Sequence, residues 1–410
     1  MFRLARRGAA VVLALGLVLA GAPSAATSSY QVHYRVELVP ADGLARVAIT
    51  IDGAARPDAL LIRADPDRYR GFAGDGEVTR NGEQVVWKIP PSGGQLRYDV
   101  RVEHRRAKKK GLDAEITDRW ALFRGEDLFP PTATDGPENE AVADLELVVP
   151  DGWSLITPYP RRKSGLFEIE QPHRFHDRPT GWMLAGHLAI TRETIAGVKV
   201  AIANPVGHDL HRLDILALLR WTLAELVQVL PNHGDRFAIV GAADPMWRGG
   251  LSGPFSLYLH ADRPLIDRDG TSPILHEMMH AFMHARAGAD GDWIVEGLAE
   301  YYSLAFLRRS NTFTQRRYER SLDKLAKKGK SAPDLLVPRA NAAVAARGAV
   351  VLAALDARIR KETDGDKSLD DVVRALEKDR AAVTTARFRE IAESVAGVSL
   401  AEFFQEYVGR

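Results

Sequence analysis

The stretch that most constrains this chain is residues 272–302, SPILHEMMHAFMHARAGADGDWIVEGLAEYY, because it predicts a metal site built on helices. His276, Glu277 and His280 form the pattern H-E-x-x-H. Residues four apart lie on one face of a helix, so the two imidazoles can bind the same ion. Glu277 lies about 100° around the helix from His276, which places its carboxylate beside the metal rather than on it. This arrangement is typical of catalytic zinc sites, which keep one position open for water.

A third protein ligand is expected in the segment 293–302, WIVEGLAEYY. Glu296 and Glu300 stand four apart there and share one face of a predicted helix. If one carboxylate binds the metal, the other can hold a ligand histidine through the ring nitrogen that does not bind the ion. Spacing alone leaves both assignments open.

The residues around the two histidines predict that their helix is buried. Ser272 suits the N-cap, and Pro273 suits the first helical position. Buried histidines with a glutamate between them are costly without a partner, and a metal ion supplies one. The apolar residues that flank the motif are Ile274, Leu275, Met278, Met279, Phe282 and Met283.

Composition narrows the chemistry further. The 410 residues include 12 histidines and no cysteine, which excludes disulfides, a thiolate nucleophile and a cysteine-type zinc site. Every metal ligand must therefore be His, Asp or Glu. The formal net charge is +1, so nothing argues for a nucleic-acid partner.

Residues 1–26 predict a secretory signal peptide. Arg3, Arg6 and Arg7 form a basic segment, and an apolar run of about 14 residues follows at 9–22. That run is short for a membrane span, although an uncleaved anchor is the alternative. We therefore expect a bacterial protein that is periplasmic or secreted, with no stable membrane insertion after cleavage.

The remainder predicts a multidomain α+β protein in three parts. Residues 27–195 contain short period-2 runs separated by turns, which predicts an N-terminal antiparallel β-sandwich. Residues 196–311 mix strands and helices and carry the metal motif, which predicts an α/β zinc domain; its run 249–260 reads as an edge strand. Residues 312–410 have helical periodicity and predict an all-helical C-terminal domain.

One other segment contains metal-binding residue types. HRFHD brings His173, His176 and Asp177 together in a loop bounded by prolines. No other group of candidate ligands accompanies it, so a loop without metal is favoured over a second metal site.

The motif HEMMH followed by WIVEGLAEYY resembles the gluzincin metallopeptidases, most closely the glycyl aminopeptidase family. The wider gluzincin group includes aminopeptidase N and thermolysin. Residues 347–376 resemble the helical segment that follows the metal site in that family, and residues 395–410 resemble its closing segment. The resemblance implies a thermolysin-like fold for the zinc domain. Family members often continue into a PDZ domain, which we do not expect here because the sequence stops at Arg410.

The resemblance also implies residue roles. His276, His280 and Glu296 are the implied ligands of one zinc ion, which leaves Glu300 to hold a ligand histidine. Zinc polarises a substrate carbonyl and lowers the pKa of water toward neutrality. Glu277 is the implied general base, which takes the proton of that water and passes it to the leaving amine.

Two positions depart from the family pattern. In the Gly-rich element before the zinc helix, here GGLSG, Ser252 replaces a glutamate that grips a free substrate amine. In the later helical segment, Ala345 replaces a tyrosine that donates a hydrogen bond to the transition-state oxyanion. Losing one such donor costs about 10²–10³ in rate. The other candidate donors are Tyr301, Tyr302, Tyr258, His260 and Arg347.

We therefore expect a zinc-dependent metallopeptidase that acts on peptide or protein substrates. Backbone groups of 253–260 are expected to pair with an extended peptide as an added strand. The alternative is a catalytically weak or inactive relative that binds zinc and recognises peptides or envelope components. The intact Glu277 favours the enzyme, because a pure binding protein does not need a base. The candidate substrate-binding residues are Gly250, Ser252, Gly253, Tyr301 and Arg347.

Overall fold

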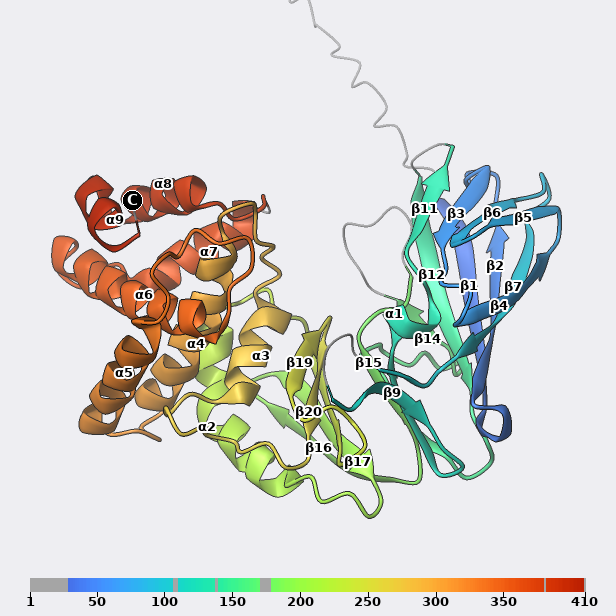
Figure 1. Cartoon of the computed structure of the whole chain (residues 1–410), viewed down its shortest axis with the longest axis horizontal. Coiled ribbons are helices and arrows are strands. Elements are labelled where there is room, and N and C mark those ends of the chain that lie inside the picture. The colour runs from blue at the N-terminus through green and yellow to red at the C-terminus, as the bar shows by residue number, and fades with distance from the viewer. Residues whose placement is uncertain (1–28, 106–109, 137–138, 170–177, 380, 409–410) are drawn as a thin grey trace, which may run out of the picture.

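The computed structural model describes residues 29–105, 110–136, 139–169, 178–379 and 381–408 (Figure 1). A part made of β-sheets lies at one end of the molecule, helices lie at the other end, and a further sheet lies between them (Figure 1). The expected α+β class is therefore present. None of the helices in the described part of the chain is both long and apolar enough to cross a membrane.

The N-terminal part contains three sheets. A six-stranded sheet has the order β14 (Phe167–Ile169), β12 (Glu140–Val148), β1 (Ser29–Val39), β2 (Leu44–Asp52), β7 (Gly94–Arg101) and β4 (Tyr69–Gly74). A four-stranded sheet has the order β11 (Thr132–Asp135), β3 (Ala59–Arg63), β6 (Gln84–Lys88) and β5 (Glu77–Asn81). A five-stranded sheet has the order β13 (Ser154–Ile156), β15 (Trp182–Gly186), β10 (Trp120–Arg124), β9 (Leu112–Ile116) and β8 (His104–Arg105). A short 3-10 helix, Pro40–Asp42, and α1 (Gly125–Leu128) interrupt the strands.

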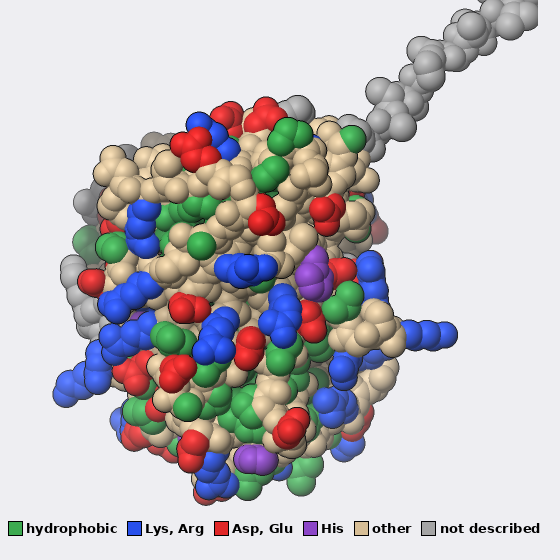
Figure 2. Space-filling model, turned by 90° about the vertical axis from the view of Figure 1, so that its right-hand side faces the viewer, with side chains coloured by type: hydrophobic (Ala, Val, Ile, Leu, Met, Phe, Trp, Pro, Cys, Tyr) green, Lys and Arg blue, Asp and Glu red, His purple; other side chains and the backbone are tan. Residues whose placement is uncertain are grey.

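Strand β1 shows how the sequence pattern produces these sheets. Every second residue is buried, from Tyr30 through Val32 to Leu38, because successive side chains point to opposite faces. The expectation of an antiparallel sandwich is wrong at one pair: β1 and β12 run parallel, from Ser29 beside Glu140 onward. A parallel neighbour requires a long connection, and here all the strands from β2 to β11 lie between the two. On the outer face of this part, positive and negative side chains are interspersed (Figure 2).

The central sheet follows. Its strand order is β16 (Leu188–Ile195), β17 (Val198–Pro205), β18 (Arg236–Ala242), β20 (Ser256–His260) and β19 (Gly250–Gly253). Strands β17, β18 and β20 are parallel, whereas β16 and β19 are antiparallel to their neighbours. The domain boundary expected at 195/196 falls in the tight turn between β16 and β17, so β16 pairs with the central sheet rather than ending the N-terminal part.

Both faces of the central sheet are covered. On one face, Val200, Phe237 and Leu257 share a core with α2 (Arg212–Val229) and α3 (Pro273–Phe282). On the other face, Ala238 and Val240 pack with Trp120, Leu122, Trp182 and Leu184 of the N-terminal part. The N-terminal part is therefore an apolar cover of the central sheet.

The helical part continues the core on the α3 side of the sheet. Its helices are α4 (Asp292–Arg309), α5 (Gln315–Gly329), α6 (Ala342–Glu362), α7 (Leu369–Asp379), α8 (Thr385–Ala396) and α9 (Ala401–Tyr407). Helices α4 and α6 cross where Gly297 meets Gly348: a Cβ added to Gly348 would lie 2.7 Å from the carbonyl oxygen of Trp293 and 3.1 Å from the Cα of Gly297. The backbones approach this closely because neither glycine has a side chain.

Candidate metal centre

Helix α3 carries both histidines and is anchored at its start. The Ser272 hydroxyl accepts a hydrogen bond from the backbone N–H of Leu275, and Pro273 occupies the first turn. The apolar flank of this helix, including Met278 and Met279, is fully buried. Burial of that flank turns the opposite side of α3, with its histidines, toward α4.

Donor atoms of three residues meet between α3 and α4. The Nε2 atoms of His276 and His280 lie 3.1 Å apart. The Glu296 carboxylate oxygens lie 3.4 Å from His276 Nε2 and 3.5 Å from His280 Nε2. Together these residues form a group that can hold a metal ion.

The donor separations fit zinc. Zinc binds imidazole nitrogen at about 2.0–2.1 Å and carboxylate oxygen at about 2.0–2.2 Å, so two ligands of a tetrahedral ion lie about 3.3–3.5 Å apart. The separations of 3.1, 3.4 and 3.5 Å are close to that range. Two imidazole nitrogens and one carboxylate are also a ligand set that catalytic zinc sites use.

Glu300 occupies the position behind His276. Its Oε2 lies 3.1 Å from His276 Nδ1, on the other side of the ring from the donor Nε2, and the residue is 8% exposed. Of the two assignments that spacing left open, the geometry places Glu296 at the donor group and Glu300 behind it. This is the contact that the predicted role of Glu300 requires.

The electrostatics of the group favour a cation. Burial lowers the pKa of His276, but its hydrogen bonds to Glu296 and Glu300 outweigh burial and raise the pKa to about 10. Burial raises the pKa of Glu296, but its hydrogen bonds with His276 and His280 outweigh burial and hold that pKa well below its usual range. The carboxylates thus stabilise positive charge between them, which is the place a divalent ion would take.

Glu277 lies beside the donor group, next to strand β19. Its Oε2 accepts a hydrogen bond of 2.7 Å from the backbone N–H of Ser252. A Cβ added to Gly250 would lie 3.5 Å from the Glu277 Cγ, an ordinary contact distance, so this part of β19 lies directly beside the glutamate. Gly253 lies farther along the strand, where its added Cβ would contact Gly181 and Trp182 of the N-terminal part.

Solved structures with a similar fold include an aminopeptidase N family protein and an M1 zinc metallopeptidase. An aminopeptidase N family protein from Idiomarina loihiensis matches with a TM-score of 0.72 and 15% identity, over 92% of this chain and 76% of that one. An M1 zinc metallopeptidase from Deinococcus radiodurans matches with a TM-score of 0.60 and 17% identity, over 93% of this chain and 94% of that one. The fold is M1 peptidase-like. No protein-family model and no curated protein matches the sequence.

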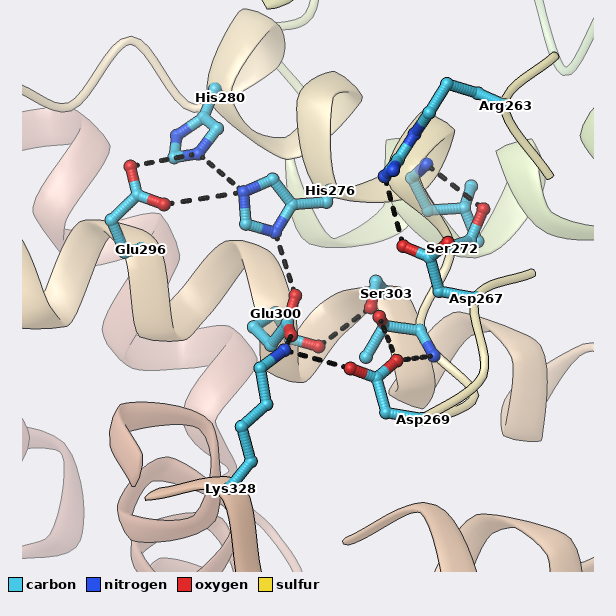
Figure 3. A network of polar contacts seen from close by, with 12 residues as sticks. Arg263, Asp267, Asp269, Ser272, His276, His280, Glu296, Glu300, Ser303 and Lys328 are labelled. Carbon is cyan, nitrogen blue, oxygen red and sulfur yellow. Dashed lines mark hydrogen bonds and ion pairs between the residues drawn. The ribbon is translucent and has the colours of Figure 1, made fainter. Parts of the chain in front are cut away.

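A polar network extends from the donor group into the helical part (Figure 3). Lys328, in the last turn of α5, lies 2.9 Å from the Asp269 carboxylate and 3.9 Å from the free oxygen of Glu300. Asp269 in turn accepts a hydrogen bond from the Thr271 hydroxyl, just before α3. Sequence reasoning missed Lys328 and Asp269, because neither lies at a fixed spacing from the motif.

Two predicted substrate-binding residues lie elsewhere. Tyr301 is buried, and its hydroxyl donates to Asp356 at 3.0 Å, so it does not face the metal group. Arg347 donates to the carbonyl oxygens of Ala332, Pro333 and Tyr407, and so fixes the end of the chain against α6. Both assignments to the substrate site are therefore wrong: each side chain is committed to a structural contact.

The remaining candidate oxyanion donors have other partners as well. The hydroxyl of Tyr302 donates to Asp370 at 2.8 Å, and that of Tyr258 donates to the Trp247 carbonyl at 2.8 Å. His260 is fully buried and accepts from the backbone N–H of Asp262. Ala345, at the position of the family tyrosine, is 6% exposed. Among the residues that the structure describes, no hydroxyl or guanidinium from the predicted set points to the metal group.

The free edge of the central sheet also differs from the prediction. Strand β20 (Ser256–His260) pairs with β18 on one side and with β19 on the other, so its backbone is not free to pair with a peptide. The strand at this edge of the described sheet is β19, which touches Glu277, and β16 lies at the other edge. The Pro254–Phe255 turn folds the predicted single run into a hairpin. The segment with His173, His176 and Asp177 lies outside the described residues.

Proposed function

We propose that this chain is a zinc-dependent metallopeptidase of the gluzincin type that hydrolyses peptide bonds in peptide or protein substrates. The observation that carries the proposal is the donor group of His276, His280 and Glu296, with separations of 3.1–3.5 Å and Glu277 beside it. The M1-like fold supports it, because solved structures of that fold come from zinc peptidases. The closer resemblance to glycyl aminopeptidases rests on the sequence motifs.

Each residue of the group has a defined task in this proposal. His276, His280 and Glu296 would hold one zinc ion, which supplies Lewis acidity toward the scissile carbonyl and toward water. Glu300 holds His276 so that Nε2 carries the lone pair. Glu277 accepts a proton from the attacking water and delivers it to the leaving amine, and the Ser252 N–H fixes its carboxylate for that task.

The substrate is proposed to bind along β19. This strand lies at one edge of the described central sheet and passes directly beside Glu277. An extended peptide can add to such an edge through main-chain hydrogen bonds. Ser252 offers no carboxylate to a free amine, so we propose internal peptide bonds or unusual substrates rather than strict N-terminal trimming.

A catalytically weak or inactive relative is the second candidate. Ala345 supplies no hydroxyl, and Tyr301, Tyr302 and Tyr258 are bonded to other groups. Without an oxyanion donor, hydrolysis would be slower by about 10²–10³ than in a complete site. Such a protein would bind zinc and recognise peptides or envelope components.

Location is proposed from residues 1–26 alone, whose basic and apolar segments favour export to the periplasm or medium. The mature N-terminus, measured by mass spectrometry of the secreted protein, is expected between residues 23 and 27. An intact Met1 would contradict this proposal.

The enzymatic proposal is tested with fluorogenic peptides and the zinc-loaded protein. We expect one zinc ion per chain in both the natural protein and Glu277→Gln, and hydrolysis that falls by about 10²–10⁴ in the variant, because only the base is removed. Glu296→Ala is the companion variant and should lose zinc. Stoichiometric zinc with equal inactivity of both proteins across a broad peptide library would favour the binding protein; tight stoichiometric zinc in Glu296→Ala would move the third ligand elsewhere.

A further inference from the structure

A cavity of about 430 Å³ lies on the face of the central sheet that is turned toward the N-terminal part. Thr157, Pro158 and Tyr159, which follow β13, form one wall. Strands β16, β17 and β18 form the other. Helix α3 packs on the opposite face of this sheet, so the cavity is separate from the metal group.

The strand register places cations side by side in this cavity. Thr194 of β16 is opposite Lys199 of β17, and Lys199 is opposite Arg236 of β18. Directly opposite residues of neighbouring strands project from the same face, so these three side chains form one row. The next row on that face, two residues along each strand, is Arg192, Ala201 and Ala238. The three strands thus place three cationic side chains, Arg192, Lys199 and Arg236, around Ala201 and Ala238, which form the floor of the cavity.

The cations outnumber their counter-charges. Asp235 is the shared partner of Lys199, at 2.8 Å, and of Arg236, at 2.7 Å. Arg192 is exposed and has no hydrogen bond or ion pair with any described residue. Glu168 also interacts electrostatically with Arg236, but it is paired with Arg162, so two positive charges remain in excess at the cavity wall.

The remaining acid of the wall does not reduce this excess. Glu193 lies between Arg192 and Thr194 on β16, so its side chain projects from the opposite face. There it forms two hydrogen bonds, of 2.8 and 2.6 Å, with Arg220 of α2. The Glu193 carboxylate therefore neutralises Arg220 on the helix side of the sheet and not the cations of the cavity.

The cavity lies where the apolar contact between the two parts stops. Farther along the same strands, Ala203 and Val240 pack with Trp182 and Leu184. Toward the starts of β17 and β18 the residues on this face change to Lys199 and Arg236, across the cavity from Pro158 and Tyr159 of the N-terminal part. Lys199 and Arg192 are exposed there, so their charged ends can be reached by a ligand from solvent.

We propose that this cavity binds a small organic anion that carries a carboxylate or phosphate group. Guanidinium groups match both groups with paired N–H donors, and Lys199 adds a third charge. A volume of about 430 Å³ lies within the usual range for small-molecule sites. The alanine floor and the Pro158–Tyr159 wall contact the carbon skeleton of the ligand, while Arg192 binds its charged end.

The test is calorimetric titration of the zinc-loaded full chain with succinate and with glycerol 3-phosphate, at constant ionic strength. These probes separate a carboxylate ligand from a phosphate ligand. We expect saturable binding of at least one probe with a Kd of about 1 mM or lower. Arg192→Gln should weaken binding by about 10-fold or more, because it removes a charge-assisted hydrogen bond. Thr194→Glu should abolish it, since a tethered carboxylate beside Lys199 would occupy the cations.

The matched control is Arg63→Gln, which changes the net charge equally at an exposed ion pair on β3. Loss of binding in the two cavity variants with retention in this control supports the site. Two results would overturn the proposal: neither probe binds saturably, or Arg192→Gln and Arg63→Gln weaken binding to the same extent. Because Arg192 and Thr194 are both exposed, their replacement should leave the thermal midpoint unchanged, and circular dichroism checks this.

Discussion

Glu300 Oε2 lies 3.1 Å from Nδ1 of His276, the ring nitrogen that faces away from Glu296 and His280. A carboxylate at this position accepts a hydrogen bond from Nδ1–H, which keeps that proton on Nδ1 and leaves the lone pair on Nε2. The tautomer that a metal requires is therefore set by α4, the same helix that supplies Glu296. Helix α4 thus controls both the position of the His276 ring, through Glu296 and Glu300, and the ring nitrogen that carries the proton, through Glu300.

Glu300→Gln is expected to weaken zinc affinity by about 10–100-fold, because an amide holds the imidazole less firmly than a carboxylate. Competition with a chromogenic chelator measures the affinity. The control is Glu319→Gln, which removes an exposed carboxylate on α5 that contacts only Gln315 among the interactions described. Equal zinc affinity of Glu300→Gln and the natural protein would contradict the role of Glu300.

Tyr301→Phe distinguishes a structural tyrosine from a substrate-binding one. The variant loses the hydrogen bond to Asp356, so we expect the free energy of unfolding to fall by about 1–2 kcal/mol. Zinc affinity and any peptide hydrolysis should stay within about twofold of the natural protein. If the variant loses hydrolysis but keeps its stability, measured by urea unfolding, Tyr301 would be a substrate-binding residue as the sequence predicted.

Gly348→Ala should destabilise the crossing of α4 and α6. The added Cβ would meet the Trp293 carbonyl oxygen at 2.7 Å, and overpacking of this kind costs about 1–3 kcal/mol. Because α4 carries Glu296, zinc affinity should fall with stability. Ala357→Ser, on the exposed side of α6, is the control and should change the thermal midpoint little. If the thermal midpoint of Gly348→Ala equals that of the natural protein, the two helices can move apart to admit the Cβ without loss of stability.

Glu377, on α7, predicts a pH dependence of stability. Burial raises its pKa to about 7, and its Oε2 has no hydrogen-bond partner among the described residues. In the unfolded chain the pKa is about 4.3, so the folded state holds the proton more tightly. The contribution of Glu377 to stability is therefore present below pH 4.3 and is lost as pH rises to about 7.

Glu377→Gln should remove this loss. At pH 8 the variant is expected to be more stable by about 1–2 kcal/mol, a value reduced from the full shift because the residue is only half buried. At pH 4 the two proteins should unfold at nearly the same urea concentration. A difference of the same size at both pH values would mean that the carboxyl does not titrate in this range.

Local patterns in the sequence predicted the helices of the site well. The helix start at Ser272–Pro273 is present, and the region after residue 312 is helical, as its periodicity predicts. These features depend on caps and periodicity, which are properties of neighbouring residues. Asp292, in the first turn of α4, instead accepts a hydrogen bond from the backbone N–H of Ala340, a contact with a distant segment.

Contacts between distant segments were harder to predict. The failure at Tyr301 has a geometric cause: five residues after Glu296, a helical side chain points about 140° away from it. Arg347, in the second turn of α6, binds carbonyl oxygens, whereas Lys328, in the last turn of α5, binds carboxylates. The partners of both lie on other segments of the chain, so only the tertiary packing decides which partner each one reaches.

The two covered faces of the central sheet have a consequence for how this protein can be divided. A chain that began at residue 196 would lack β16 and would present Ala238, Val240 and Tyr258 to water. We expect such a fragment to aggregate, because that apolar face would have no cover. We therefore expect the strands before residue 196 and helices α3 and α4 after it to unfold as one cooperative unit, so that recombination would transfer the half with the candidate metal centre to another protein only together with its β-sheet cover.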